Sequence, residues 1–230
     1  MSDTDVSALA QSIDQTMLKP TVGPQEATKW IVANRDHGFA TLCVSPFLVP
    51  TAADLLAGSA TALCSVVGFP LGFGLTSNKS QEAANLTVLG CREVDMVINI
   101  GALLEGDESY VLADISAVVA AVAQASNGSS SVKVILETGY LEESDIIRGC
   151  RIAREAGAAF VKTSTGFGPR GASVLDVEIM RETVGGELGI KAAGGIRDLD
   201  TALAMLDAGA TRIGTSAGRE MLAEATARGI

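Results

Sequence analysis

Short apolar runs alternate with longer amphipathic segments along the chain. The runs have the length and the Val, Ile and Ala content of strands that are buried on both faces of a sheet. Counted from Ile13, they predict eight strands, at residues 13–18, 40–45, 61–68, 94–99, 132–137, 158–162, 190–193 and 211–213. Helical periodicity predicts helices at residues 5–13, 24–36, 46–57, 77–89, 102–125, 142–156, 174–183, 199–207 and 219–227, with Ser77 as an N-terminal cap.

The alternation of strands and helices determines the predicted fold. Parallel strands joined by helices form a sheet that is covered on both faces. Eight such units within 230 residues favour one closed (β/α)₈ TIM barrel, a single domain over residues 1–230 that begins with a short N-terminal helix. A doubly wound open sheet is the alternative. No G-x-G-x-x-G motif follows the first strand, which weakens a dinucleotide-binding interpretation.

Two predicted strands carry a charged residue inside an apolar run. Lys162 ends the run Ala-Ala-Phe-Val-Lys, and Asp95 is the second residue of Val-Asp-Met-Val-Ile-Asn. Burying a charge is costly unless the charge is paired. Lys162 could extend its ammonium group to solvent at the strand end, and Asp95 could form a buried ion pair with Lys133. The alternative is a role in chemistry, with Lys162 at the carboxyl end of its strand, where barrel active sites lie, and Asp95 as an acid or base that faces the barrel interior.

Lys191 is a second lysine on a strand that approaches a glycine loop, in Gly-Ile-Lys-Ala-Ala-Gly-Gly. A lysine attacks a carbonyl only as the free amine. An ammonium group ~5 Å away, at an effective dielectric of ~20, disfavours the protonated form by about 3 kcal/mol. Together, Lys162, Lys191 and Asp95 therefore fit Schiff-base chemistry, in which a carboxylate transfers protons and no metal is needed.

Three glycine-containing loops follow the sixth, seventh and eighth predicted strands. They read Thr-Ser-Thr-Gly at 163–166, Gly-Gly-Ile-Arg at 194–197 and Gly-Thr-Ser-Ala-Gly at 214–218. Backbone N–H groups in such loops hold phosphate, and the loops after strands seven and eight are the usual phosphate site of (β/α)₈ enzymes. A single glycine is commonly a turn residue, but the combination favours phosphate binding. Arg197 could add positive charge or form a surface salt bridge.

The overall composition argues against several other classes of protein. The net charge of −10 is unlike a nucleic-acid-binding protein, no uncharged apolar run approaches the ~20 residues of a membrane span, and Met-Ser-Asp-Thr-Asp is unlike a signal peptide. Cys43, Cys64, Cys91 and Cys150 lack C-x-x-C spacing and are interpreted as reduced core thiols of a cytoplasmic protein. The single histidine, His37, fits a helix C-terminus better than a ligand, so no zinc site is expected.

These stretches together resemble the deoxyribose-phosphate aldolases, a family of class I aldolases. The matching segments are Asp-Gln-Thr-Met-Leu-Lys-Pro at 14–20, Leu-Cys-Val at 42–44, Val-Val-Gly-Phe-Pro-Leu-Gly at 66–72 and Val-Asp-Met-Val-Ile-Asn-Ile-Gly at 94–101. They continue with Lys-Val-Ile-Leu-Glu-Thr-Gly at 133–139, Phe-Val-Lys-Thr-Ser-Thr-Gly-Phe-Gly at 160–168, Ile-Lys-Ala-Ala-Gly-Gly-Ile-Arg at 190–197 and Arg-Ile-Gly-Thr-Ser at 212–216. The segments occur in order from the first predicted strand to the last.

The resemblance implies a metal-free, cofactor-free lyase on a (β/α)₈ barrel. Such an enzyme reversibly cleaves 2-deoxy-D-ribose 5-phosphate to D-glyceraldehyde 3-phosphate and acetaldehyde, in deoxyribonucleotide catabolism. By motif position, Lys162 corresponds to the Schiff-base lysine, Lys191 to the lysine that lowers its pKa, and Asp95 to the proton-transferring carboxylate. The resemblance also places Thr16, Cys43, Gly166, Gly194, Gly195 and Ser216 among the residues that bind the substrate and its phosphate.

The sequence departs from the family pattern at a few positions. Gln15 stands where many members have His, Ser45 where Asn is common, and Ala217 where a second Ser is frequent. The first two leave the chemistry little affected, whereas Ala217 is expected to weaken phosphate binding. Some longer members end in a tyrosine proposed to assist proton transfer. This sequence ends in Ala-Arg-Gly-Ile, so that role is expected to be absent or filled by water.

Two other functions stay open on the sequence. A different Schiff-base aldolase or a transaldolase-like enzyme would share the lysine but prefer a ketone donor. A comparison of acetaldehyde with dihydroxyacetone as the donor substrate therefore distinguishes such an enzyme from a deoxyribose-phosphate aldolase. A non-catalytic phosphosugar sensor would keep the loops but would not need two strand-end lysines and an interior aspartate. The aldolase interpretation predicts a cytoplasmic homodimer that binds a phosphosugar and acetaldehyde, and neither nucleic acid nor membrane.

Overall fold

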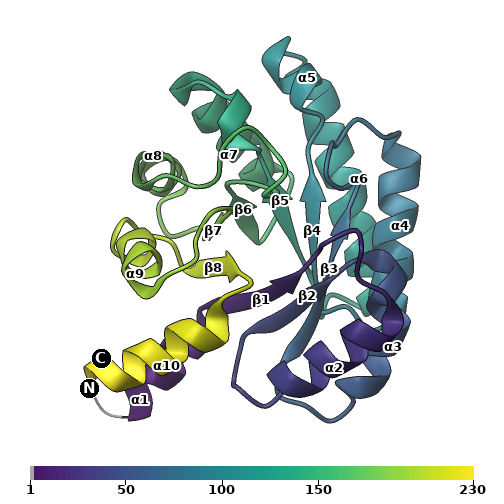
Figure 1. Ribbon diagram of the computed structural model, residues 1–230. Helices are drawn as coiled ribbons and strands as arrows, with labels where there is room; N and C mark the ends of the chain where they lie inside the picture. The colour runs from purple at the N-terminus through teal and green to yellow at the C-terminus, as the bar shows by residue number, and fades with distance from the viewer. Residues whose placement is uncertain (1–2) are drawn as a thin grey trace.

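The computed structural model describes residues 3–230 and shows a closed barrel of parallel strands surrounded by helices (Figure 1). The strands are β1 (Ile13–Met17), β2 (Thr41–Val44), β3 (Ala62–Val67), β4 (Glu93–Val97), β5 (Ser131–Ile135), β6 (Phe160–Lys162), β7 (Gly189–Ala193) and β8 (Arg212–Thr215). Each strand pairs with the next one in the sequence, and β1 pairs with β8, which closes the barrel. The predicted (β/α)₈ fold is confirmed.

Helices cover the outer face of the barrel. They are α1 (Asp3–Gln11), α2 (Pro24–Asn34), α3 (Val49–Leu55), α4 (Thr76–Val88), α5 (Ile100–Leu104), α6 (Glu108–Ser126), α7 (Glu143–Glu155), α8 (Val174–Val184), α9 (Leu199–Asp207) and α10 (Gly218–Arg228), with 3₁₀ turns at Pro46–Leu48 and Thr138–Tyr140. The first helix, α1, lies beside the last, α10, so the two ends of the described chain are close together (Figure 1).

The side chains of each strand alternate between the outer and the inner face of the barrel. Outward residues such as Leu42 and Val94 belong to the main apolar core, which lies between the strands and the helices. The inner face holds a smaller apolar cluster formed by Cys43, Cys64 and Val66. A charged residue at an inward position is shielded from the helices and must find its partners on other strands.

Two predicted helix starts differ from the observed ones for local reasons. The helix predicted at 102–125 is two helices, α5 and α6, because Gly106 adopts a left-handed φ of 79° between them. Asp107 then caps α6 through its side chain. Ser77 is not a cap of α4, because that helix begins one residue earlier, at Thr76, and has no side-chain cap.

Other boundaries shift by a few residues. The strand predicted at 132–137 is β5 and ends at Ile135, and two residues later Glu137 takes a left-handed φ of 59°. The helix predicted at 46–57 begins as a 3₁₀ turn before α3. The helix predicted at 5–13 is α1, which ends at Gln11 because Ile13 already belongs to β1.

Among the described residues, one helix, α6, has the length and composition of a membrane span, but it packs as one of the barrel helices. The helix contacts α4 and β5, and residues such as Ile115 and Val118 are buried. Its Asp114 is fully buried and accepts hydrogen bonds from Lys79 Nζ at 2.7 Å and from Thr76 Oγ1 at 2.8 Å. This buried ion pair ties α6 to α4 within the barrel wall.

The cysteines and the histidine lie where the sequence predicts. All four cysteines are free and buried. His37 is exposed just beyond the end of α2, where its Nε2 lies 3.1 Å from the carbonyl oxygen of Ala33.

Candidate active site

Charged residues gather inside the barrel because neighbouring strands carry one each at inward positions. The register places Asp95 of β4 beside Lys133 of β5, and Lys162 of β6 beside Lys191 of β7. All four side chains are buried. Lys162 is 3% exposed, so its ammonium group does not extend into solvent as the alternative interpretation required.

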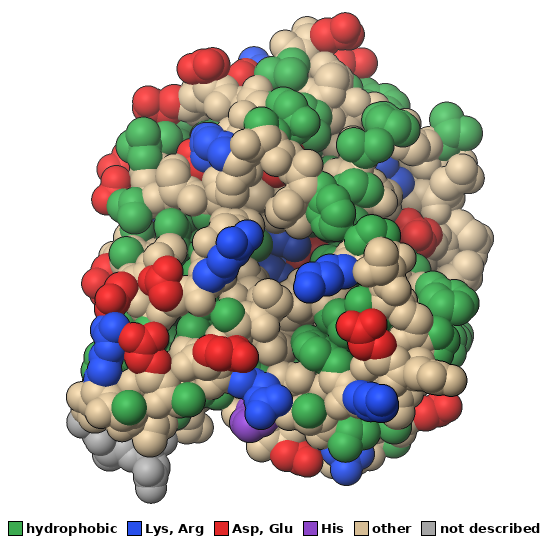
Figure 2. Space-filling view, in the orientation of Figure 1, with side chains coloured by type: hydrophobic (Ala, Val, Ile, Leu, Met, Phe, Trp, Pro, Cys, Tyr) green, Lys and Arg blue, Asp and Glu red, His purple; other side chains and the backbone are tan. Residues whose placement is uncertain are grey.

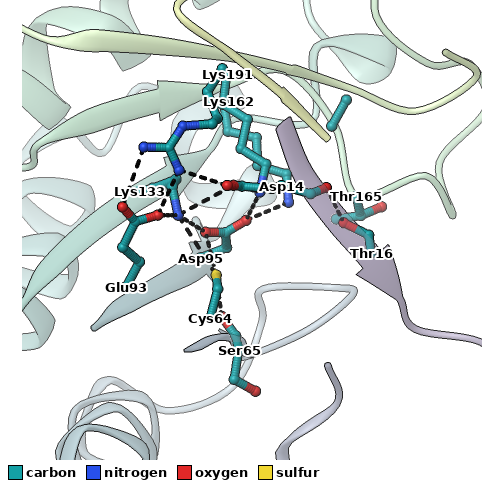
Figure 3. A network of polar contacts seen from close by, with 12 residues as sticks. Asp14, Thr16, Cys64, Ser65, Glu93, Asp95, Lys133, Lys162, Thr165 and Lys191 are labelled. Atoms are coloured by element: carbon teal, nitrogen blue, oxygen red, sulfur yellow. Dashed lines mark hydrogen bonds and ion pairs between the residues drawn. The ribbon is translucent and has the colours of Figure 1, made fainter. Parts of the chain in front are cut away.

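Asp95 joins the lysines of this group (Figure 3). Its Oδ2 accepts hydrogen bonds from Lys162 Nζ at 2.8 Å and from Lys191 Nζ at 2.7 Å. Its Oδ1 accepts from Lys133 Nζ at 2.9 Å, so the ion pair suggested by the sequence is present as well. Because Lys162 and Lys191 share one oxygen atom, their nitrogens are at most about 5.5 Å apart. The structure thus brings the three predicted catalytic residues together, with both lysines bound to the carboxylate of Asp95.

A second layer of charges lies on the same inner face (Figure 3). Asp14 pairs with Lys191 at 2.5 Å and with Lys133 at 3.5 Å. Glu93 also contacts Lys133. Arg212 connects the two acids, at 2.6 Å from Asp14 and 3.0 Å from Glu93. The sequence did not indicate the acids or Arg212 as parts of this site.

Ion pairing keeps Asp95 and Lys191 in their charged forms. Burial opposes ionisation of Asp95, but the three ammonium groups, that of Lys133 first, outweigh burial and hold the pKa of the carboxyl well below its usual range. Burial likewise opposes the charge of Lys191, yet the carboxylates of Asp14 and Asp95 raise its pKa above the usual value. Lys191 is therefore a permanent cation at neutral pH.

This cluster has one more basic group than acidic groups. Its described members are Lys133, Lys162, Lys191, Arg212, Asp14, Glu93 and Asp95. Lys162 has a single carboxylate partner, Asp95, whereas each of the other three basic groups has at least two. Loss of a proton from Lys162 would balance the cluster. Of the four, Lys162 is therefore the group best placed to be a free amine.

The glycine loops after β6, β7 and β8 surround the mouth of the barrel. Gly166, Gly194 and Gly195 have left-handed φ values of 87°, 89° and 80°, which favour glycine. Within the described residues, the backbone N–H groups of these glycines and of Ser216 have no backbone acceptor. A Cβ atom on Gly166 or Gly195 would meet no other atom within 4 Å. The loops therefore present free N–H donors next to open space, as a phosphate site requires.

A cavity of about 530 Å³ opens between these loops and the segment after β1. Its lining includes Thr16, Lys19, Gly166, Gly194, Gly195, Arg197 and Ser216. Lys19 and Arg197 are exposed. Arg197 forms no ion pair among the residues described, so the surface salt bridge considered as its alternative role is not observed. Figure 2 shows Lys and Arg side chains around a hollow near the centre of the face, in a protein whose net charge is −10. Cys43 lies on β2, buried inside the barrel and outside this lining.

Gln15, a departure from the family pattern, anchors the loop that carries Ser216. Its Nε2 donates to the carbonyl oxygen of Ser216 at 3.3 Å and to Asn34 Oδ1 at 3.0 Å. Its Oε1 accepts from the backbone N–H of Gly218 at 3.0 Å. The amide thus fixes both ends of the segment that includes Ala217.

Glu137 is a candidate that sequence reasoning missed. Its carboxylate is buried, and its Oε2 accepts from the backbone N–H of Thr165 at 3.1 Å and from the hydroxyl of the same residue. Gly168 packs so closely that a Cβ there would lie 2.8 Å from Glu137 Cδ. These contacts hold the loop between Lys162 and Gly166. The sequence could have indicated Glu137 as a candidate, because it is a carboxylate just after a barrel strand, where functional residues cluster.

Cys43, Cys64 and Asp95 form the one group among the described residues with ligand atoms close enough together for a metal ion, within 4.8 Å of one another. The carboxylate in this group already contacts three ammonium groups. A divalent cation placed there would be repelled by those charges at short range. The arrangement therefore fits amine chemistry better than metal binding.

Comparison with known proteins adds relatives that match nearly the whole chain. The model of the DeoC/LacD family of aldolases matches residues 28–224. The deoxyribose-phosphate aldolase of Caldanaerobacter subterraneus subsp. tengcongensis is 46% identical over 222 residues, which cover 96% of this chain and 95% of that protein. The deoxyribose-phosphate aldolase of Enterococcus faecalis is 45% identical over 221 residues, which cover 96% of this chain and 99% of that protein.

Solved structures show the same extent of similarity. An aldolase named QR15 superposes with a TM-score of 0.88 at 36% sequence identity, covering 96% of this chain and 97% of that one. A structure described as a unique tetrameric deoxyribose phosphate aldolase from Aeropyrum pernix superposes with a TM-score of 0.87 at 30% identity, covering 98% of this chain and 93% of that one.

Proposed function

The chain belongs to the DeoC/LacD family of aldolases, and we propose that it is a deoxyribose-phosphate aldolase in which Lys162 forms the Schiff base. It cleaves 2-deoxy-D-ribose 5-phosphate to D-glyceraldehyde 3-phosphate and acetaldehyde, and it also catalyses the reverse reaction. The observation that carries the assignment of the nucleophile is the shared oxygen of Asp95, which holds Lys162 next to the permanent cation Lys191.

The first step is attack of the Lys162 amine on C1 of the open-chain sugar. The positive charge of Lys191 disfavours a second positive charge nearby, so it favours the free amine at Lys162. Addition gives a carbinolamine, and loss of water gives an iminium ion. Lys191 is kept charged by two carboxylates, Asp14 and Asp95, so it stays a cation while Lys162 gains and loses protons.

The second step is cleavage of the bond between C2 and C3. Asp95 accepts the proton of the C3 hydroxyl, directly or through water, and the electrons of the broken bond move to the iminium ion, which becomes an enamine. D-Glyceraldehyde 3-phosphate leaves. Protonation of the enamine at C2 and hydrolysis of the new iminium ion then release acetaldehyde and the amine of Lys162.

The phosphate end of the substrate is assigned to the glycine loops. The free N–H groups of Gly166, Gly194, Gly195 and Ser216 support this assignment. Lys19 and Arg197, which line the same cavity, add positive charge for a dianionic group. Thr16 also lines the cavity, and its hydroxyl donates to the backbone carbonyl oxygen of Asp14 at 2.9 Å.

A donor comparison tests the proposed function. The purified protein is incubated with 2-deoxy-D-ribose 5-phosphate, and both products are measured, D-glyceraldehyde 3-phosphate by a coupled dehydrogenase and acetaldehyde by chromatography. In the synthetic direction, acetaldehyde and dihydroxyacetone are compared as donors. We expect cleavage and a strong preference for acetaldehyde. Activity with dihydroxyacetone alone would identify a ketone-dependent aldolase, and binding without turnover would identify a sensor.

The assembly and the compartment are further proposals. We expect a homodimer, since exposed apolar residues such as Phe47 and Phe73 would be covered in an oligomer. Light scattering separates a dimer from a monomer and from a tetramer, the state named for the Aeropyrum pernix relative. Four free cysteines fit the reducing cytoplasm, the location we expect.

A further inference from the structure

Two thiols face each other inside the barrel, next to Asp95. The parallel strands β2 and β3 pair so that Cys43 lies directly opposite Cys64. Both side chains are buried in the inner apolar cluster. Their sulfur atoms and a carboxylate oxygen of Asp95 lie within 4.8 Å of one another. The mechanism above assigns no chemical step to either thiol.

The strand geometry permits a covalent bond between these residues. Paired strands are roughly 4.8 Å apart, and the Cα atoms of disulfides are usually about 4.4 to 6.8 Å apart. Cys43 and Cys64 occupy such a pair of positions, and their sulfur atoms lie within 4.8 Å of each other.

Cys43 is the more reactive of the two thiols. Its hydrogen bond with Cys64, helped by the charges of Lys191 and Lys162, lowers the pKa of Cys43 despite burial. Burial raises the pKa of the Cys64 thiol well above its usual value. A thiolate with a second thiol beside it is the arrangement found in oxidation-sensitive cysteine pairs.

The thiols are buried, but they lie close to the nucleophile that the substrate must reach in the proposed reaction. Cys64 Sγ donates to Asp95 Oδ1 at 3.4 Å, and Lys162 Nζ donates to the other oxygen of the same carboxylate at 2.8 Å. Acetaldehyde must leave from this nucleophile in the proposed reaction. Hydrogen peroxide is smaller than acetaldehyde and can follow the same route.

We propose that Cys43 and Cys64 form a site of reversible oxidation by hydrogen peroxide, and that the disulfide between them inactivates the enzyme. The Cys43 thiolate attacks one peroxide oxygen, the O–O bond breaks, and the departing hydroxide takes up a proton to leave as water. The sulfenic acid at Cys43 is then attacked by the sulfur of Cys64. The S–S bond forms, the S–O bond breaks, and a second water leaves with the proton of Cys64. The two sulfurs together lose two electrons, and the peroxide gains them.

The disulfide inactivates the enzyme through Asp95. Cys64 can no longer donate to Asp95 Oδ1, which is then left with Lys133 as its donor. The linked sulfur atoms also move relative to the carboxylate that Lys162 and Lys191 share. Because Asp95 orients Lys162, we expect the oxidised enzyme to retain less than a tenth of its cleavage activity.

Peptide mapping and activity after peroxide treatment test the proposal. The full-length enzyme is treated with graded hydrogen peroxide, and samples are digested under non-reducing conditions. Cys91→Ala and Cys150→Ala are matched controls, because these thiols are buried in the outer core and burial raises the pKa of each to about 12. Cys64→Ala removes the resolving thiol, and its response is compared with its own untreated activity.

The expected result is a linked peptide pair containing Cys43 and Cys64, a mass loss of two hydrogen atoms, and at least a tenfold activity loss that dithiothreitol restores. The two controls should respond like the wild type, and Cys64→Ala should lose the reversible response. Activity loss without the linked pair would overturn the proposal, and so would a linked pair with full activity. The activity readout rests on the proposed function, whereas the mass readout does not, so an inactive untreated enzyme would refute that function alone.

Discussion

Lys191 provides the sharpest test of the electrostatic part of the mechanism. Lys191→Leu removes a permanent positive charge whose nitrogen is at most about 5.5 Å from that of Lys162. At an effective dielectric of ~20, this charge disfavours protonation of Lys162 by about 3 kcal/mol. Its loss should reduce the fraction of free amine at neutral pH by roughly a hundredfold. The charge balance agrees, because without Lys191 the cluster is balanced only when Lys162 is protonated.

Reductive trapping measures this effect directly. The protein is mixed with acetaldehyde, the imine is reduced with borohydride, and the rate of covalent labelling is followed by mass spectrometry. Labelling of Lys191→Leu should be slower by roughly two orders of magnitude at neutral pH. It should partly recover at about pH 9, because the amine loses its proton as the pH rises. Lys191→Arg should label faster than Lys191→Leu, since the charge remains although the side chain differs in shape.

Equal labelling rates for Lys191→Leu and the wild type at neutral pH would refute this reasoning, provided that circular dichroism shows an intact fold. A slow rate that does not recover at higher pH would also refute it, because a loss of geometry rather than of charge would then explain the defect.

Three further predictions concern independence from metal ions, the phosphate-binding role of Gly195, and the role of Glu137. Activity should be unchanged by EDTA, because the iminium ion accepts the electrons of the broken bond and no metal is needed for this. A loss of activity that zinc reverses would indicate a metal-dependent aldolase. Gly195→Val should raise KM for the phosphorylated sugar far more than for 2-deoxyribose, since its side chain would enter the space beside the N–H donors and strain a φ of 80°. Equal effects on both sugars would remove phosphate from this loop. Glu137→Gln should cost about 1 to 3 kcal/mol in transition-state binding of the phosphorylated sugar, because one of the acceptors for Thr165 becomes a donor, while acetaldehyde labelling at Lys162 stays near the wild-type rate. A parallel loss of labelling would show that Glu137 supports the nucleophile instead.

The fold and the centre of the site were predictable because both produce recognisable local patterns in the sequence. Eight apolar runs separated by helices are sufficient to predict the barrel. Asp95 and Lys162 stand out because each interrupts an apolar strand, and a buried charge needs a partner or a function. Lys191 could be assigned with them because it follows the same pattern one strand later.

The rest of the ion cluster was not predictable because it depends on barrel closure. Arg212 begins β8 and Asp14 lies in β1, and only the pairing of these two strands brings them together. Glu93 begins β4 and is indistinguishable in sequence from a solvated residue at a strand start. Glu137 was missed for a different reason, since its contact with Thr165 depends on how the loop after β6 folds.

The most direct test of the central claim is the position of the covalent adduct. The protein is treated with acetaldehyde and borohydride, digested, and searched for the peptide that carries an added ethyl group. We predict a single adduct on Lys162, absent in Lys162→Arg and Lys162→Ala. An adduct on Lys191 would contradict the assigned roles, and a folded protein without an adduct on either lysine would contradict Schiff-base catalysis altogether.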